Sequence, residues 1–446
     1  MKQTILLIIT LAFPGFSFAQ QVSYNDVAVI VNDSSQTSID IGNYFAQQRN
    51  IPSQNIIHVT TTTQEEIDTA QLFDLLSQVS NYLSANNLDD SINYIVTTKG
   101  VPLKVAFGNC AFGGRCSSVE FEMALILGPY SNSIAMGGSI YNPYLGSQTN
   151  FARSIYHIFL VTRLDGYSYD DVITLIDRSG PNIPVIKSQA LFVFDFSHLG
   201  YNVPSVDSSF MRPAADTLTK LGWEYVFDGD TATLLNQSNV MGLYSFDLNS
   251  SGQNLNYNWL RGSIVKLCGC NSSATFDESE NVDENYLVAD AVKEGATGAE
   301  GWAYCGYAAT DLIYEIVLSR YLDTANHFNL AESYYAALPG LSWPHEIIGD
   351  PKTSIVIDTL NGISPIANSE IKLYPNPSSG IFQVSFPSTQ NCYASVWDVL
   401  GQIMWEEKWI TSNKVHSINL QSQPAGIYFL KVKQGDEERV VKLVKD

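Results

Sequence analysis

Apolar runs of strand length alternate with helical patterns between residues 26 and 360, and this alternation restricts the fold more than any other feature. Residues 27–31 and 190–194 are apolar throughout, whereas residues 71–83 carry Leu and Val at helical spacing. Strands that are apolar along their whole length are typical of parallel sheets, because helices cover both faces of such sheets. We therefore predict an α/β fold with a mostly parallel sheet and helices on both faces.

The sequence divides into four segments. They are a signal peptide (1–19), the α/β domain (20–358, either one domain or two halves at about 20–180 and 181–358), a linker (359–370) and a small all-β, immunoglobulin-like sandwich (371–446). The signal peptide is indicated by Lys2, an apolar core and the small residues Ser17 and Ala19 before the expected cleavage site. No later segment is long and apolar enough to span a membrane, so we expect no transmembrane segment in the mature chain.

The charge of the chain limits its partners. The sequence has 24 Lys and Arg against 45 Asp and Glu, a formal net charge of -21. Such a charge repels nucleic acid, so no nucleic-acid partner is expected. Phosphate-loop, dinucleotide and zinc motifs are missing, so no cofactor is expected. The acidic residues at 277–285 offer ligands for loosely bound Ca²⁺, but a solvated loop that caps the next helix is the favoured interpretation.

Six cysteines are too few for a disulfide-based fold in a chain of this length. Cys110 and Cys116 flank a short Gly-rich loop that a disulfide could close. Cys268 and Cys270 end an apolar strand, where either thiol could be a nucleophile. Alternatively, one of these two thiols forms a disulfide with Cys305 on a neighbouring strand.

Two histidines could act as a base for such a thiol. His198 follows a predicted strand, at the end where ligands collect in open α/β sheets, and Asp195 could orient it. His345 is the second candidate. For both residues, an ordinary loop histidine without a catalytic role is the favoured interpretation.

Four further charged residues are candidates for binding. Glu120 and Glu122 lie close to Ser118, and they would share one face on a strand but not on a helix. They could hold a cation, act as an acid/base pair or form a polar edge. Arg163 and Asp165 follow an apolar stretch and could clamp a substrate or fix a turn.

The C-terminal segment carries a set of short motifs. They are Leu-Tyr-Pro-Asn-Pro-Ser-Ser-Gly at 373–380, Val-Trp-Asp-Val-Leu-Gly-Gln at 396–402, Pro-Ala-Gly-Ile-Tyr-Phe-Leu at 424–430 and Arg-Val-Val-Lys-Leu-Val at 439–444. The segment resembles the C-terminal sorting domain of the Bacteroidetes type IX secretion system. This resemblance implies that the type IX machinery binds residues 371–446. It also implies export through the periplasm to the cell surface or the medium.

The upstream domain resembles an uncharacterised secreted bacterial family found in species with exosortase-type sorting. The shared stretches include Gly-Val-Pro-Leu at 100–103, Val-Thr-Arg-Leu-Asp-Gly at 161–166 and Ile-Gly-Asp-Pro at 348–351. A wider resemblance is to gingipain-like and caspase-like cysteine peptidases. It implies that Cys270 or Cys268 stands at the nucleophile position. The strand expected to carry the catalytic histidine (242–249) has Asp247 and no histidine, and a carboxylate would raise the pKa of the thiol.

The favoured hypothesis is an exported protein of unknown activity whose main domain is non-catalytic or binds a peptide or glycan at the strand ends. The alternative is a gingipain-like cysteine hydrolase with His198 or His345 as a displaced base. A third hypothesis is carboxylate-based hydrolysis, which requires Glu120 and Glu122 to converge on a pocket.

Overall fold

The computed structural model describes most of the chain in two compact units, one within residues 1–358 and one within residues 359–446. The described residues are 22–108, 110, 115–135, 140–195, 211–228, 233–246, 254–269, 271–280, 286–305, 311–358, 372–385, 392–399, 401–409, 415–434 and 437–446. The predicted signal peptide and linker lie outside them, as do Cys270, His198 and Asp247.

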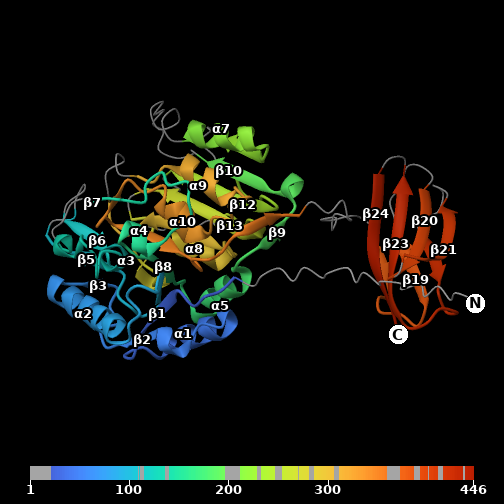
Figure 1. Cartoon of the computed structure of the whole chain (residues 1–446). Coiled ribbons are helices and arrows are strands. Elements are labelled where there is room, and N and C mark those ends of the chain that lie inside the picture. Colours follow the sequence, from blue (N-terminus) through green and yellow to red (C-terminus); the bar gives the residue numbers. More distant parts are fainter. Residues whose placement is uncertain are drawn as a thin grey trace, which may run out of the picture. The chain divides into compact units, whose positions relative to one another are not determined.

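A ten-stranded sheet forms the centre of the first unit (Figure 1). In spatial order, its strands are β11 (Glu224–Asp228), β10 (Leu191–Asp195), β12 (Val240–Phe246), β13 (Trp259–Cys268), β14 (Gly298–Trp302), β16 (His345–Ile348), β8 (Leu160–Leu164), β4 (Tyr94–Thr98), β1 (Val27–Asn32) and β2 (Ile56–Val59). All neighbours are parallel except β14 and β16, which are antiparallel. The predicted mostly parallel α/β sheet is therefore confirmed.

The antiparallel β14–β16 pair divides the sheet into two halves that run in opposite directions. In the first half, the chain order of the strands is β1, β2, β4, β8 and β16, and the spatial order is second, first, third, fourth, fifth. The second half repeats this order with β10, β11, β12, β13 and β14. Ligands of such doubly wound sheets bind at the carboxyl ends of the strands, where the strand order reverses. The reversal lies between β1 and β4 in one half and between β10 and β12 in the other.

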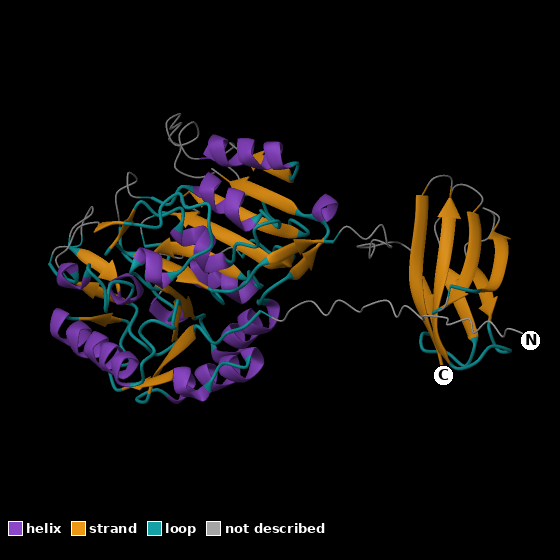
Figure 2. Cartoon of the chain, in the orientation of Figure 1, coloured by secondary structure: helices purple, strands orange, loops and turns teal. Residues whose placement is uncertain are grey.

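Helices cover the sheet (Figure 2). The longer ones are α1 (Gln36–Arg49), α2 (Thr69–Ala85), α5 (Tyr169–Arg178), α7 (Arg212–Leu221), α8 (Val288–Glu294), α9 (Tyr314–Tyr321) and α10 (Leu330–Tyr335). Every residue of β1, β4 and β8 is buried, so both faces of these strands are covered. Helix α1 packs closely on β1 at Gly42, where an added Cβ would lie 2.2 Å from Cγ1 of Val31.

Short elements complete the first unit. They are α3 (Val119–Met123), α4 (Arg153–Tyr156), the three-stranded sheet of β3 (Glu66–Ile67), β5 (Lys104–Ala106) and β6 (Cys116–Ser118), and the strand pairs β7 (Ile140–Tyr141) with β15 (Gly340–Leu341) and β9 (Ile183–Val185) with β17 (Ile355–Ile357). Among the described residues, no helix is both long enough and apolar enough to cross a membrane.

The second unit is all-β. One antiparallel sheet contains β18 (Lys372–Tyr374), β19 (Ile381–Ser385) and β22 (Val415–Asn419); the other contains β21 (Ile403–Trp409), β20 (Cys392–Asp398), β23 (Gly426–Gln434) and β24 (Glu437–Lys445). Phe382 of the first sheet and Val396 and Leu430 of the second belong to one apolar core. The predicted all-β region is confirmed, and its immunoglobulin-like topology stays a prediction.

Candidate functional site

The carboxyl ends of β10, β12 and β13 bring together part of the predicted site. Asp195 pairs in register with Ser245 at the end of β12, and Phe246 pairs with Cys268 at the end of β13. The predicted location of Cys268 beside the strand that should carry a histidine is therefore observed. The segments that follow these strands contain His198, Asp247 and Cys270, and these three residues lie outside the described part of the chain.

Cys268 is a free, buried thiol that takes part in a buried polar network. Its Sγ donates a hydrogen bond to Oδ2 of Asp311 at 2.8 Å. Oδ1 of Asp311 lies 2.6 Å from Nζ of Lys266, which comes two residues before Cys268 on β13. Sequence reasoning missed both Asp311 and Lys266.

The network continues to His345. Nζ of Lys266 lies 2.6 Å from Oε2 of Glu300, and Oε1 of Glu300 lies 2.6 Å from Nδ1 of His345. All three side chains are fully buried. Burial of so many charges is tolerated only where they neutralise one another, and here one ammonium lies between two carboxylates. Two candidate catalytic residues, Cys268 and His345, therefore belong to the same network, but each bonds to a carboxylate.

The electrostatics of this network keep the thiol protonated. Burial and the adjacent charge of Asp311 raise the pKa of Cys268 well above its usual range, and Lys266 opposes this only in part. Burial alone would lower the pKa of Lys266, but Asp311 and Glu300 raise it. Burial would raise the pKa of Asp311, but the Lys266 charge and the hydrogen bond from Cys268 lower it. A reactive cysteine needs the opposite arrangement, in which a cation or a helix terminus stabilises the thiolate.

Metal binding is a second possibility for these residues. Glu300, Asp311 and His345 bring possible ligand atoms within 4.8 Å of one another. The Lys266 ammonium already lies 2.6 Å from both carboxylates, so it supplies the positive charge that a metal ion would bring. The donor set fits a buried ion-pair network better than a metal centre.

Asp195 is fully buried at the end of β10. Its Oδ2 accepts a hydrogen bond from the backbone N–H of Leu234 at 3.0 Å. The carboxylate therefore fixes the segment that precedes β12. Its predicted role in orienting His198 involves a residue outside the described part of the chain and stays a prediction.

Arg163 and Asp165 form a second buried network with Glu120. Nε of Arg163 donates to Oδ2 of Asp165 at 2.9 Å, and Nη1 donates to Oε1 of Glu120 at 2.5 Å. The guanidinium also donates to the backbone carbonyls of Val101 and Pro102. These contacts favour the structural interpretation, because Arg163 holds the chain after β4 against the end of β8.

The third hypothesis, carboxylate hydrolysis at Glu120 and Glu122, does not fit the geometry. Ser118 caps α3, and successive helical residues turn by about 100°, so the two side chains point in different directions. Glu120 bonds to Arg163, whereas Glu122 accepts hydrogen bonds from Ser342 Oγ at 2.6 Å and the backbone N–H of Ala135 at 2.9 Å. The residues lie on a short helix and not on a strand, so they do not converge.

Glu346 is a buried acid that sequence reasoning missed. It is fully buried on β16, and alternation along the strand directs it to the face opposite His345. Neither of its carboxyl oxygens has a hydrogen-bond donor among the described residues. Burial and the nearby charge of Glu120 raise its pKa well above the usual range, against the effect of Arg163. This direction of the pKa favours the protonated form of Glu346 beside Glu120. The sequence clue was an acid inside a buried strand, and the same clue applies to Glu300.

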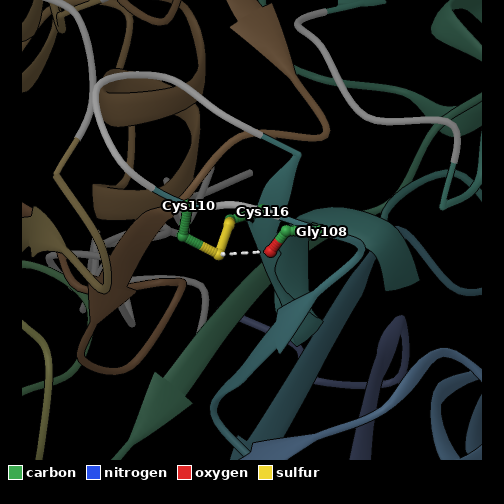
Figure 3. Close-up of a disulfide and its surroundings, with 3 residues drawn as sticks. All are labelled: Gly108, Cys110 and Cys116. Atoms are coloured by element: carbon green, nitrogen blue, oxygen red, sulfur yellow. Dashed lines mark hydrogen bonds between the residues drawn. A yellow bond between two sulfur atoms is a disulfide. The ribbon is translucent and has the colours of Figure 1, made fainter.

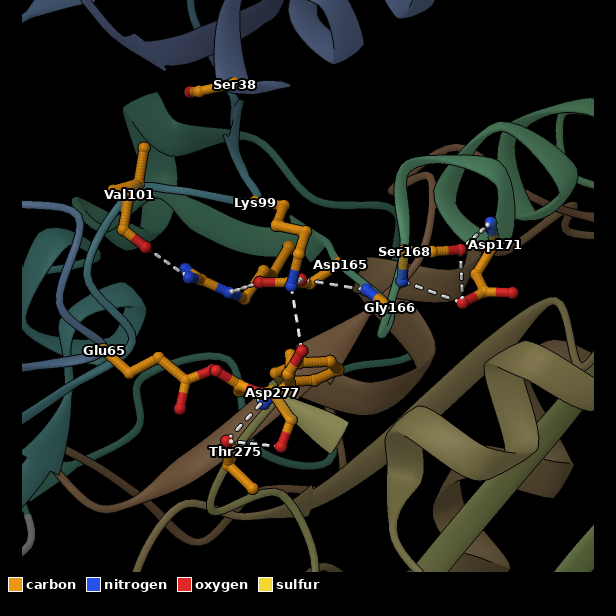
Figure 4. Close-up of polar contacts among 12 residues, drawn as sticks. Ser38, Glu65, Lys99, Val101, Asp165, Gly166, Ser168, Asp171, Thr275 and Asp277 are labelled. Carbon is orange, nitrogen blue, oxygen red and sulfur yellow. Dashed lines mark hydrogen bonds and ion pairs between the residues drawn. The ribbon is translucent and has the colours of Figure 1, made fainter. Parts of the chain in front are cut away.

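Lys99 connects the first half of the sheet to a segment that follows β13 (Figure 4). Its Nζ lies 3.3 Å from Oδ1 of Asp165 and donates to the carbonyl of Phe276 at 2.9 Å. The N–H of Phe276 donates in turn to Oε1 of Glu65 at 2.7 Å. This polar seam explains why the loop lies against the carboxyl ends of β4 and β8.

Two acids in the described part of the acidic run, Asp277 and Glu278, have local partners. The side chain of Asp277 accepts hydrogen bonds from the N–H and Oγ of Ser279, which lower its pKa. Glu278 forms an exposed ion pair with Lys293 at 2.6 Å. Residues 281–285 lie outside the described part, so Ca²⁺ binding stays a prediction.

The predicted disulfide between Cys110 and Cys116 is confirmed (Figure 3). Cys305 is also disulfide-bonded, whereas Cys268 is a free thiol. Cys268 is therefore not the partner of Cys305, and this half of the disulfide alternative is wrong because the Cys268 thiol bonds to Asp311 instead.

The comparisons with known proteins agree with the C-terminal assignment. Residues 372–446 match the family described as the secretion system C-terminal sorting domain. The molecule is thus an exported α/β protein with a C-terminal sorting domain. This type IX sorting domain indicates export to the cell surface or the extracellular space. A search of curated proteins found no match.

Two solved structures are similar to the chain. One is the complex of the pro- and mature domains of RgpB from Porphyromonas gingivalis, with 11% identity and a TM-score of 0.42, covering 94% of this chain and 100% of that one. The other is the Arg-specific cysteine proteinase gingipain R, with 11% identity and a TM-score of 0.42, covering 95% of this chain and 98% of that one. Likeness at this level does not extend to the chemistry of a site.

Proposed function

We propose that this protein is a type IX-secreted binding protein whose α/β domain does not use Cys268 as a nucleophile. The carrying observation is the state of that thiol, which is buried and donates to Asp311. A thiol with a raised pKa is mostly protonated at neutral pH and is a poor nucleophile. The export half of the proposal rests on the sorting domain at 372–446.

The ligand proposed for the binding role is a peptide or glycan at the carboxyl ends of the second half. Two considerations support this location. The reversal of strand order between β10 and β12 lies at this edge of the sheet, where doubly wound sheets bind ligands. The corresponding edge of the first half is filled by the chain itself, because Nδ2 of Asn32 donates to the carbonyls of Thr62 and Gly100.

Thiol labelling of the mature protein tests the non-catalytic assignment. Iodoacetamide at neutral pH, followed by mass spectrometry, is expected to leave Cys268 unmodified in the folded protein and to modify it after unfolding in urea. Cys110 and Cys116 provide an internal control, since they should react only after reduction. Rapid labelling of Cys268 in the folded protein would contradict the proposal and favour the cysteine hydrolase. Rapid labelling of Cys270 without reductant would likewise favour the hydrolase, with Cys270 as its nucleophile.

A further inference from the structure

A pocket of about 220 Å³ lies away from Cys268, between the end of α1, the loop after α5, strand β9 and the start of β13. Its lining includes Tyr24, Gln48, Arg49, residues 179–184 and Arg261. Arg261 stands near the amino end of β13, whereas Cys268 ends the same strand. The pocket is therefore separate from the carboxyl-end edge considered above.

The charge of this pocket is opposite to that of the chain. Two of its lining residues are arginines and none is acidic, although the sequence has 45 acidic and only 24 basic residues. Arg178 lies close by, and burial together with the charge of Arg261 lowers its pKa. Arg49 is paired with Asp350, so the net positive charge beside the pocket comes from Arg178 and Arg261, and such a charge attracts anions.

Arg49 is held in place from behind. Its Nε donates to Oδ2 of Asp350 at 2.7 Å, and Nη2 donates to the carbonyls of Ile176 and Ser179 at 2.6 and 3.1 Å. Asp350 is itself fixed by the hydroxyl of Tyr24 at 2.8 Å. The guanidinium of Arg49 is therefore held in one orientation at the wall of the pocket.

Arg261, the second arginine of the pocket lining, is held less tightly than Arg49. Its side chain is exposed, and it donates only to the backbone carbonyls of Arg178 and Asp177, at 3.4 and 3.2 Å. No carboxylate in the described part of the chain forms an ion pair with it. Gly180, with a φ of +121°, lies against the Arg49 guanidinium without a side chain. This glycine keeps the space beside Arg49 open.

We infer that this pocket binds a small oxyanion, the phosphate or carboxylate group of a ligand, through Arg49 and Arg261. Planar guanidinium groups match both oxyanions in geometry and charge. The volume of about 220 Å³ is below the roughly 300–1,000 Å³ of typical small-molecule pockets, so it suits an end group or a small ion. This inference goes beyond the proposed function and does not depend on it.

Isothermal titration of the mature protein tests the site with two probes, inorganic phosphate and glucuronate, each against sodium chloride at equal ionic strength. Saturable binding of phosphate alone assigns a phosphate site, and saturable binding of glucuronate assigns a carboxylate site. The variant Arg261→Gln should weaken binding at least about tenfold, because it removes a charge-assisted hydrogen bond. Lys220→Gln is the matched control. It removes an exposed charge on α7, which does not line the pocket, and should bind like the wild type.

Two results would overturn the inference. One is that neither probe binds saturably, and the other is that Arg261→Gln binds as tightly as the wild type. Arg261 is chosen over Arg49 because its contacts are exposed, so its loss should not unfold the chain. Thermal unfolding of each variant checks this. Either negative result would leave the Cys268 labelling outcome unchanged, so failure here is distinguishable from failure of the proposed function.

Discussion

At the scale of single residues, the most distinctive feature of this domain is its buried charged side chains. Lys266 is fully buried between Glu300 and Asp311, and Arg163 is buried between Glu120 and Asp165. Each cation lies between two acids that would otherwise have no cationic partner in an apolar interior. Such networks are more sensitive to the loss of one member than to replacement of the whole set by apolar residues.

The substitution Lys266→Met should destabilise the protein by about 3–5 kcal/mol, because it leaves two carboxylates buried without their cation. Urea unfolding monitored by fluorescence would measure the change. Lys220→Met on the exposed surface of α7 is the control and should change stability by less than about 0.5 kcal/mol. Equal effects of the two substitutions would show that the Lys266 ion pairs contribute nothing net.

Glu346 gives a prediction about pH. Its pKa in the folded protein is raised above its unfolded value of about 4.3. Its proton therefore stabilises the fold fully below that value, and this contribution is lost as pH rises through the folded pKa. The variant Glu346→Gln removes the titration but keeps a donor for Glu120. Its stability relative to the wild type should increase from pH 5 to pH 9 in urea unfolding. A difference independent of pH would mean that Glu346 is ionised in the folded state.

At the scale of elements, the packing of α1 on β1 depends on Gly42. An added methyl group would lie 2.2 Å from Val31 Cγ1, inside any normal contact distance. Gly42→Ala should therefore destabilise the protein by about 1–3 kcal/mol, despite the better helix propensity of alanine. Asn43→Ala, one residue along on the exposed side of α1, is the control and should be neutral or slightly stabilising in the same unfolding assay. A stabilised Gly42→Ala would show that β1 can move away.

Elements with strong local patterns could be predicted from the sequence, and those defined by distant partners could not. The apolar runs at 27–31 and 190–194 agree with β1 and β10, and the helical pattern at 71–83 lies within α2. β14 has a weak sequence signal, because the small residues of Gly298–Trp302 give little apolar pattern. β16 and the order of the sheet were not predicted, since long-range pairing leaves no local mark. A structural contact between Arg163 and Asp165 was among the sequence interpretations, whereas the bonds of Glu120 to Arg163 and of Asp311 to Cys268 were missed for the same reason.

At the scale of the whole molecule, the sorting domain and the α/β domain are separate units. The first has its own apolar core and the second has another. Removal of residues 371–446 should therefore leave a folded α/β unit that no longer reaches the cell surface or the medium. Cell fractionation and immunoblotting would locate this truncated protein in the periplasm. Its appearance in the medium at the level of the full-length protein would contradict the role of the tail.

The position of β16 has a consequence for the order in which the chain folds. Strand β8 lacks one of its two neighbours, β16, until the entire second half has been synthesised, because β16 comes from residues 345–348. The first half cannot complete its sheet before β16 is made, so the free edge of β8 stays exposed during synthesis and transport. Contacts this distant along the chain slow folding. We therefore expect the domain to depend on protection by chaperones until nearly its last strand has emerged.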